Sequence, residues 1–225
     1  MNAPRGATRA VIFDLDGLLL DTEPLWRAVE VERFGALGLP IDEAATHETT
    51  GLRIDEVCEH WYERFGAREP SPEALARSVV DGVIARLDEA PALPGAKAAV
   101  AQVERRGLRL AVASSSPRRL IDAALARLEL SGRFAVICSA EDEHHGKPHP
   151  ATYLSAAREL GVSPRRCLAL EDSLNGLIAA KAARMRCVVV PSAQQRGAPC
   201  WAIADRALES LEQLEAILEE LLESA

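Results

Sequence analysis

The sequence lacks the features that mark a membrane protein or a nucleic-acid-binding protein. No stretch approaches the ~20 apolar residues that a membrane-spanning helix needs. Lys and Arg are outnumbered, 26 against 34 acidic residues, and a net charge of −8 disfavours binding to nucleic acid or anionic lipid. Residues 1–9 contain no long apolar stretch, so no secretory signal is visible. We therefore expect a cytoplasmic protein that binds neither nucleic acid nor membrane.

Cysteine pairs are also missing. The five cysteines are an odd number and contain no C-x-x-C motif, which favours neither a disulfide framework nor a zinc site. Hydrophobic residues make up 48% of the 225 residues, enough for a sizeable core. An acidic protein can still bind a phosphorylated small molecule if a metal, a lysine or a helix N-terminus supplies positive charge locally.

From residue 95 onward, short β-rich runs alternate with helical stretches. A first strand over 9–13, ending at Asp14, precedes them. The alternation predicts a parallel sheet with helices on both faces, which binds its ligands beyond the carboxyl ends of the strands. The later strands are expected at Leu108–Ala113, Phe134–Cys138, Cys167–Leu170 and Cys187–Val190.

Residues 22–90 break this alternation, because they contain amphipathic helical stretches and no convincing β-run. A helical insertion after the first strand would lie above that strand's carboxyl end. The sequence therefore predicts an α/β protein with a Rossmann-like parallel sheet core, 1–21 and 91–225, and an inserted α-helical cap, 22–90.

Two carboxylates stand where the first strand ends, at Asp14 and Asp16, and a glycine follows them. Residues i and i+2 of a strand point to the same side, so both side chains could face one pocket. An Asp can attack phosphorus as a nucleophile, and a second carboxyl can protonate the leaving oxygen. Two solvated turn aspartates are the plain alternative.

Three other strand ends carry polar groups that could share this pocket. A Ser-Ser-Ser-Pro run begins at Ser114, Lys147 follows the next strand, and Glu171 and Asp172 follow the one after. Hydroxyls at a helix start can hold phosphate, an ammonium can neutralise it, and paired acids suit a hard cation. Taken singly, each has an ordinary explanation as a helix cap or a solvated lysine.

Together and in this order, the four motifs resemble the signature of the haloacid dehalogenase superfamily. The resemblance spans nearly the whole chain. It implies a phosphatase that acts on a small phosphorylated metabolite, with Asp14 as the nucleophile that forms an aspartyl-phosphate. It also implies that Asp16 is the general acid that later activates water.

The same resemblance implies a magnesium-dependent site. Ser114 and Lys147 would hold the transferring phosphoryl group, with Ser115 beside them. Mg²⁺ would be bound by Asp14, by the backbone carbonyl of Asp16 and by Asp172, with Glu171 close by.

The segments 21–27, 50–55 and 170–176 further resemble the bacterial sugar-phosphatase branch, which includes hexitol phosphatases and 2-deoxyglucose-6-phosphate phosphatases. This makes Glu23, Arg53 and Asn175 additional substrate-binding candidates, and a monomer the expected state. His144 and His145, just before Gly146, depart from the family pattern, and together with His149 they could bind a transition metal.

Two other functions stay open. Phosphomutases of the β-phosphoglucomutase type share all four motifs, but they carry a cap histidine and a cap lysine where this chain has Trp26 and Thr49. A non-catalytic sugar-phosphate sensor could lose Asp14 or Asp16, and this chain has both.

Overall fold

The core is a parallel sheet, and the predicted fold class is confirmed. The computed structural model describes residues 8–223. Its strands are β1 (Ala10–Phe13), β2 (Arg109–Ser114), β3 (Val136–Ser139), β4 (Cys167–Glu171), β5 (Arg186–Val189) and β6 (Arg206–Ala207). They form one sheet in the order β3-β2-β1-β4-β5-β6 with parallel pairing throughout, the order of a Rossmann-like sheet. Because the direction of winding changes at β1, a ligand crevice is expected above its carboxyl end.

Successive residues of β1 point to opposite faces of the sheet, as the strand period requires. Val11 and Phe13 belong to one hydrophobic cluster, whereas Ala10 and Ile12 belong to the other. The first face is covered by α5 (Ala96–Arg105), α6 (Arg118–Arg127) and α9 (Leu214–Glu223), and the second by α7 (Ala151–Leu160) and α8 (Leu174–Ala182). Each β1 residue is fully buried, which explains why the strand reads as a continuous apolar run.

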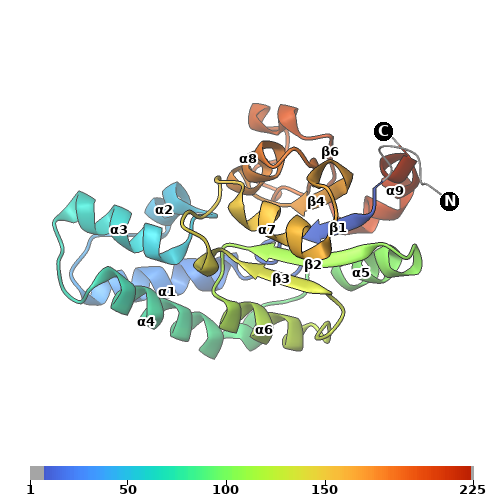
Figure 1. Cartoon of the computed structure of the whole chain (residues 1–225). Helices are drawn as coiled ribbons and strands as arrows, with labels where there is room; N and C mark the ends of the chain where they lie inside the picture. Colours follow the sequence, from blue (N-terminus) through green and yellow to red (C-terminus); the bar gives the residue numbers. More distant parts are fainter. Residues whose placement is uncertain (1–7, 224–225) are drawn as a thin grey trace.

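The segment between β1 and α5 is helical, as predicted. It contains α1 (Glu23–Ala36), α2 (Glu43–Thr46), α3 (Ile54–Phe65) and α4 (Pro72–Ala85), which lie together at one end of the molecule in Figure 1. Ser71 caps α4 by accepting from the Ala74 amide, and Pro72 opens the helix. Helix α4 packs on both α1 and α3. The boundaries 22 and 90 stay a prediction, and residues 1–7 and 224–225 of the predicted core lie outside the described residues.

Several element ends differ from the sequence prediction. Strand β6 was not predicted, since it has only two exposed residues. The last helix, α9, begins only at Leu214, because a 3-10 turn over Leu211–Gln213, capped by Ser210, precedes it. Pro117 is the N-cap of α6, so this helix begins after the serine run. None of the described helices is both long and apolar enough to cross a membrane.

Candidate active site

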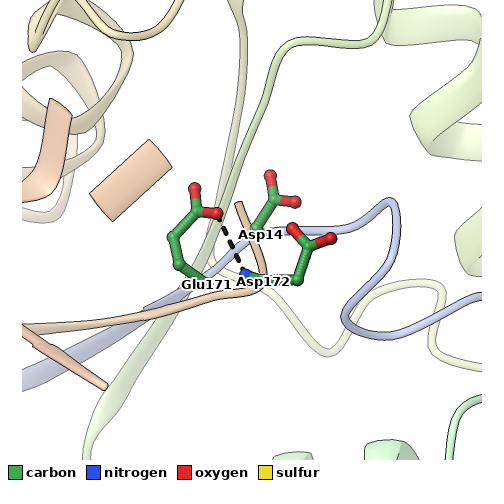
Figure 2. A group of neighbouring side chains, drawn as sticks. All are labelled: Asp14, Glu171 and Asp172. Atoms are coloured by element: carbon green, nitrogen blue, oxygen red, sulfur yellow. Dashed lines mark hydrogen bonds between the residues drawn. The ribbon is translucent and has the colours of Figure 1, made fainter. Parts of the chain in front are cut away.

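The carboxylates predicted from two strand ends lie side by side. Strands β1 and β4 pair with Phe13 opposite Leu170, which brings Asp14 next to Glu171 and Asp172. Figure 2 shows the three side chains converging at this edge of the sheet. One oxygen of each lies within 4.8 Å of the others. Among residues 8–223, this is the only such cluster of His, Cys, Asp and Glu side chains that could hold a metal ion.

Lys147 is buried against this cluster, with only 2% of its surface exposed. Its Nζ donates to Asp14 Oδ1 at 2.6 Å, to Glu171 Oε1 at 2.6 Å and to the Ala113 carbonyl at 3.0 Å. Burial alone would lower the pKa of Lys147, but the carboxylates of Asp14 and Glu171 raise it above its ordinary value. Lys147 is therefore a permanent cation beside Asp14.

Glu171 is fully buried, and donors already surround its carboxylate. Oε1 accepts from Lys147 and from the Tyr153 hydroxyl at 2.6 Å each. Oε2 accepts from the Asp172 amide at 3.1 Å and from the amide and hydroxyl of Ser173 at 3.3 and 3.1 Å. The close approach of α8 requires glycine at Gly176, where a Cβ would lie 1.8 Å from the carboxylate. Glu171 thus positions Lys147 and the start of α8.

Asp14 and Asp172 have carboxylate oxygens available for a ligand. Burial, against the opposing effect of Lys147 and with smaller contributions from Glu171 and Asp16, raises the pKa of Asp14 to about 8. Burial and the neighbouring Asp14 raise the pKa of Asp172 well above its usual value. Among the described residues, none donates a hydrogen bond to the Asp172 carboxylate. A cluster with more carboxyl groups than cations fits a hard divalent cation with oxygen ligands.

The loop after β1 is shaped to approach Asp172. Gly17 has a φ of +73°, and a Cβ there would lie 2.1 Å from Asp172 Oδ2. Only glycine meets both demands without strain. The glycine of the Asp14-x-Asp16-Gly17 motif therefore allows the loop to close over the acidic cluster.

Asp16 accepts hydrogen bonds from four side chains. Oδ1 accepts from Thr22 Oγ1 at 2.6 Å and from Trp26 Nε1 at 3.3 Å. Oδ2 accepts from Ser116 Oγ at 2.7 Å and from Ser114 Oγ at 3.3 Å. Sequence reasoning did not assign Thr22, Trp26 or Ser116 to the site. The run of three serines was a signal for Ser116, whereas the other two contacts depend on where α1 begins.

A cavity lies between the helical insertion and the edge of the sheet. The insertion supplies acidic, hydroxyl and apolar side chains to it, and the sheet edge supplies Asp16 and two serines. Its lining is formed by Asp16, Glu23, Trp26, Arg27, Glu30, Thr46, Thr49, Thr50, Gly51, Leu52, Ile54, Val57, Ser115 and Ser116. A second cavity of about 790 Å³ includes Asp172 and shares Glu23, Arg27 and Thr50 with the first, so the two meet beside the acidic cluster.

Three of the remaining candidates join the insertion to the core. Ser115 Oγ donates to the Gly51 carbonyl at 3.1 Å, and Asn175 Nδ2 donates to the Thr50 carbonyl at 3.2 Å. Arg53 donates to the carbonyls of Ala140 and Glu143 at 2.9 and 2.8 Å. It also forms an ion pair with Asp55, 2.6 Å away. These contacts hold the insertion over the sheet edge.

Glu23 lies at the start of α1 and lines both cavities. It forms an ion pair with Arg27, with 3.1 Å between Oε2 and Nη1. Burial, with a smaller contribution from Asp16, raises the pKa of Glu23 to about 7. The substrate-binding roles of Glu23, Arg53, Ser115 and Asn175 stay predictions.

The three histidines are exposed and do not belong to the acidic cluster. The rings of His145 and His149 lie 5.2 Å apart, whereas the side chains that surround Lys147 are acidic or aromatic. A transition-metal role for His144, His145 and His149 stays a prediction.

Comparison with known proteins places the chain in a family. A family model for haloacid dehalogenase-like hydrolases matches residues 8–184. Hexitol phosphatase B of Escherichia coli K12 is 42% identical over 218 residues, 96% of this chain and 98% of that protein. The structure of CbbY from Rhodobacter sphaeroides in complex with phosphate has 34% identity and a TM-score of 0.81, covering 92% of this chain and 96% of that one. The structure of β-phosphoglucomutase from Clostridium difficile has 26% identity and a TM-score of 0.84, covering 95% of this chain and 97% of that one. With the buried Asp14–Lys147 pair and the acidic cluster in place, this chain belongs to the haloacid dehalogenase-like hydrolases and is a phosphatase.

Proposed function

We propose that this phosphatase depends on Mg²⁺ and hydrolyses a sugar phosphate or hexitol phosphate through an aspartyl-phosphate on Asp14. The observation that carries the proposal is the contact between Asp14 Oδ1 and the buried Lys147 Nζ at 2.6 Å. Asp16, two residues further on, lines the adjoining cavity. A nucleophile, a cation and a second carboxyl are thus placed around one point where a phosphoryl group can bind.

The reaction has two steps. In the first, an Asp14 carboxylate oxygen attacks phosphorus, the bond from phosphorus to the substrate oxygen breaks, and Asp16 gives its proton to that oxygen. In the second, Asp16 takes a proton from water as the water oxygen attacks phosphorus, and the bond to Asp14 breaks to release phosphate. Thr22, Trp26 and Ser116 hold the Asp16 side chain in place for both transfers.

Charge is the main obstacle to the first step, because a carboxylate must approach a phosphate dianion. Lys147 offsets part of this repulsion, and the Ser114 hydroxyl lies at the same strand edge. Asp14, Asp172 and the backbone carbonyl of Asp16 would hold Mg²⁺, which supplies charge neutralisation and orientation of the phosphoryl oxygens when bound. Glu171 supports the site through Lys147 and the Ser173 turn.

The substrate class follows from the similarity to hexitol phosphatase B and from the polar lining of the cavity. A phosphomutase is the second candidate, since β-phosphoglucomutase has the same fold. Trp26 argues against it. Its indole donates to Asp16 and cannot shuttle a proton, although it occupies the position of the mutase histidine. Thr49 in place of the cap lysine leaves less charge to hold a second phosphate.

The test is hydrolysis of a hexitol phosphate or a hexose 6-phosphate in ¹⁸O-labelled water, without a bisphosphate activator. We expect one ¹⁸O to enter inorganic phosphate per turnover, because water attacks the phosphorus of the intermediate. Negligible phosphate release, together with interconversion of glucose 1-phosphate and glucose 6-phosphate in the presence of a bisphosphate, would replace the phosphatase with a mutase.

We further propose the domain bounds, the oligomeric state, the location and the partners of this phosphatase. The helical cap comprises residues 22–90, and the core comprises the rest of the chain. The phosphatase acts as a monomer in the cytoplasm on a small phosphorylated substrate, with neither nucleic acid nor membrane as a partner.

A further inference from the structure

Glu30 is a buried acid that the proposed chemistry does not use. It lies on α1 with only 7% of its surface exposed, and it lines the cavity above Asp16. Within residues 8–223, no group donates a hydrogen bond to its carboxyl and no cation pairs with it. Burial of an unpartnered carboxyl opposes folding. Such a group is expected where a ligand supplies the missing partners.

A second polar atom in the same cavity also lacks a hydrogen-bond partner. Arg27 precedes Glu30 by three residues, so the two side chains lie on neighbouring positions of one helix face. The Arg27 Nε is buried and has no hydrogen-bond partner among the described residues. The Arg27 Nε forms an ion pair with Glu43 Oε1, 3.7 Å away. The lining of the cavity thus holds a carboxyl and a guanidinium on neighbouring positions of α1, and among the described residues neither Glu30 nor the Arg27 Nε has a hydrogen-bond partner.

The hydroxyls across the cavity are already used as donors. Thr46 Oγ1 donates to the Glu43 carbonyl at 2.7 Å, and Thr49 Oγ1 donates to the Thr46 carbonyl at 3.2 Å. Both hydroxyl oxygens therefore offer only lone pairs to a ligand. A ligand with several O–H groups can donate to such acceptors and also accept from Arg27.

The charges at this end of the cavity exclude a second phosphate. Glu23 and Glu30 face one guanidinium, Arg27, which is already paired with Glu23 at 3.1 Å. Lys147, the cation that contacts Asp14, does not line this cavity, which meets the sheet edge at Asp16 and Ser116. Burial, together with Glu23 and against the effect of Arg27, raises the pKa of Glu30 to about 8. Ionised or protonated, the carboxyl can bond to a diol, but it gives no attraction to an anion.

We propose that Glu30 and Arg27 form the substrate-specificity site of this phosphatase, where they bind the hydroxyl groups of a polyol chain whose phosphate lies at Asp14 and Lys147. The proposal rests on the phosphatase function above and deepens it. The preferred substrate is a linear polyol monophosphate, and bisphosphates are disfavoured.

The test compares a hexitol 6-phosphate with n-hexyl phosphate, which has a similar primary alkoxide leaving group and no hydroxyls. The wild type should hydrolyse both and prefer the hexitol phosphate by kcat/KM. In Glu30→Leu, the ratio of the two kcat/KM values should fall about tenfold or more, because the hydroxyls lose their acceptor. Glu30→Gln keeps the shape of the side chain and one acceptor, so its kcat/KM ratio should lie between those of the wild type and Glu30→Leu.

The matched control is Glu32→Gln, on the same helix but exposed and paired with Arg86. It should leave the ratio unchanged. A ratio that shifts less than twofold in a folded Glu30→Leu protein, or that falls equally in the control, would overturn the specificity site. A wild-type preference for a hexitol bisphosphate would also overturn it. A wild type that hydrolyses neither monoester would instead remove the proposed function itself, and the specificity site with it.

Discussion

Replacement of Lys147 by methionine should destabilise the protein more than any surface lysine replacement. Methionine keeps most of the aliphatic stem but removes the ammonium that contacts Asp14, Glu171 and the Ala113 carbonyl. Two carboxylates that now lie 2.6 Å from a cation would be left unpaired in the interior. These two carboxylates also lie close to Asp172, so without the ammonium the repulsion among the three carboxylates would no longer be offset.

The magnitude follows from the two contacts. At an effective dielectric constant of 20, a pair of unit charges 2.6 Å apart attracts by about 6 kcal/mol. Desolvation of the ammonium offsets much of this, and removal of one partner of a buried ion pair typically costs about 3–5 kcal/mol. In a protein of this size, each kcal/mol lowers Tm by roughly 2–4 °C. We therefore expect a fall in Tm of about 10 °C.

The assay is urea unfolding of wild type, Lys147→Met, Glu171→Gln and the double variant, all in EDTA. Loss of Lys147 should cost less free energy of unfolding when the Glu171 charge is already absent. The two changes should therefore have a coupling energy of more than about 1 kcal/mol. Lys97→Met is the control, since Lys97 forms a surface ion pair with Glu129 in which the side chains are 49% and 83% exposed. It should cost less than about 1 kcal/mol. The reasoning is refuted if Lys147→Met is as stable as Lys97→Met, or if the effects of Lys147→Met and Glu171→Gln simply add.

Three further predictions concern activity. Asp14→Asn should show no measurable turnover, because an amide is a poor nucleophile and uncatalysed phosphomonoester hydrolysis is among the slowest of reactions; clear activity in a pure preparation would contradict the nucleophile assignment. Asp16→Asn should lose ~10²–10⁴-fold on a hexitol phosphate but less on p-nitrophenyl phosphate, whose leaving group needs no proton; equal losses would rule out Asp16 as the acid. EDTA should abolish activity, Mg²⁺ should restore it and Ca²⁺ should not, because its larger coordination shell spoils the in-line geometry; activity that follows Zn²⁺ instead would indicate His144 and His145.

The parts of the site that could be predicted are those fixed by strand ends. The apolar runs before Asp14 and Glu171 are long enough to identify buried parallel strands, and the carboxyl ends of such strands meet at one edge. Asp14, Glu171 and Asp172 therefore had to converge. The loop lysine was harder to place, because its burial depends on how the 140–150 segment folds over β3. Its place after a strand made Lys147 a candidate cation, and the resemblance to a family implied its role in holding the phosphoryl group.

The parts that could not be predicted depend on packing between distant elements. Tyr153 looks like an ordinary core residue of α7, and its hydroxyl bond to Glu171 is visible only when α7 is placed against β4. Glu30 resembles a solvated acid on an amphipathic helix. Its burial arises because α2 and α3 fold over that face of α1, a tertiary arrangement that helical periodicity does not report.

Buried acidic groups oppose folding at both ends of the site, but for different reasons. We infer from this difference how the substrate is oriented. At the sheet edge, carboxylates outnumber the one buried ammonium that contacts them, an arrangement that a phosphate and a divalent cation together can balance. At the cap, Glu30 is buried without a protein partner, and a ligand rich in hydroxyl groups can hydrogen-bond to it without adding charge. A molecule with a phosphate at one end and hydroxyls along its length can satisfy both the sheet edge and Glu30, but only when its phosphate lies at the sheet edge. Residues that cost stability in this way are retained where function needs them. Under the proposed specificity site, the position of Glu30 relative to Lys147 would therefore set the orientation in which a phosphorylated polyol binds.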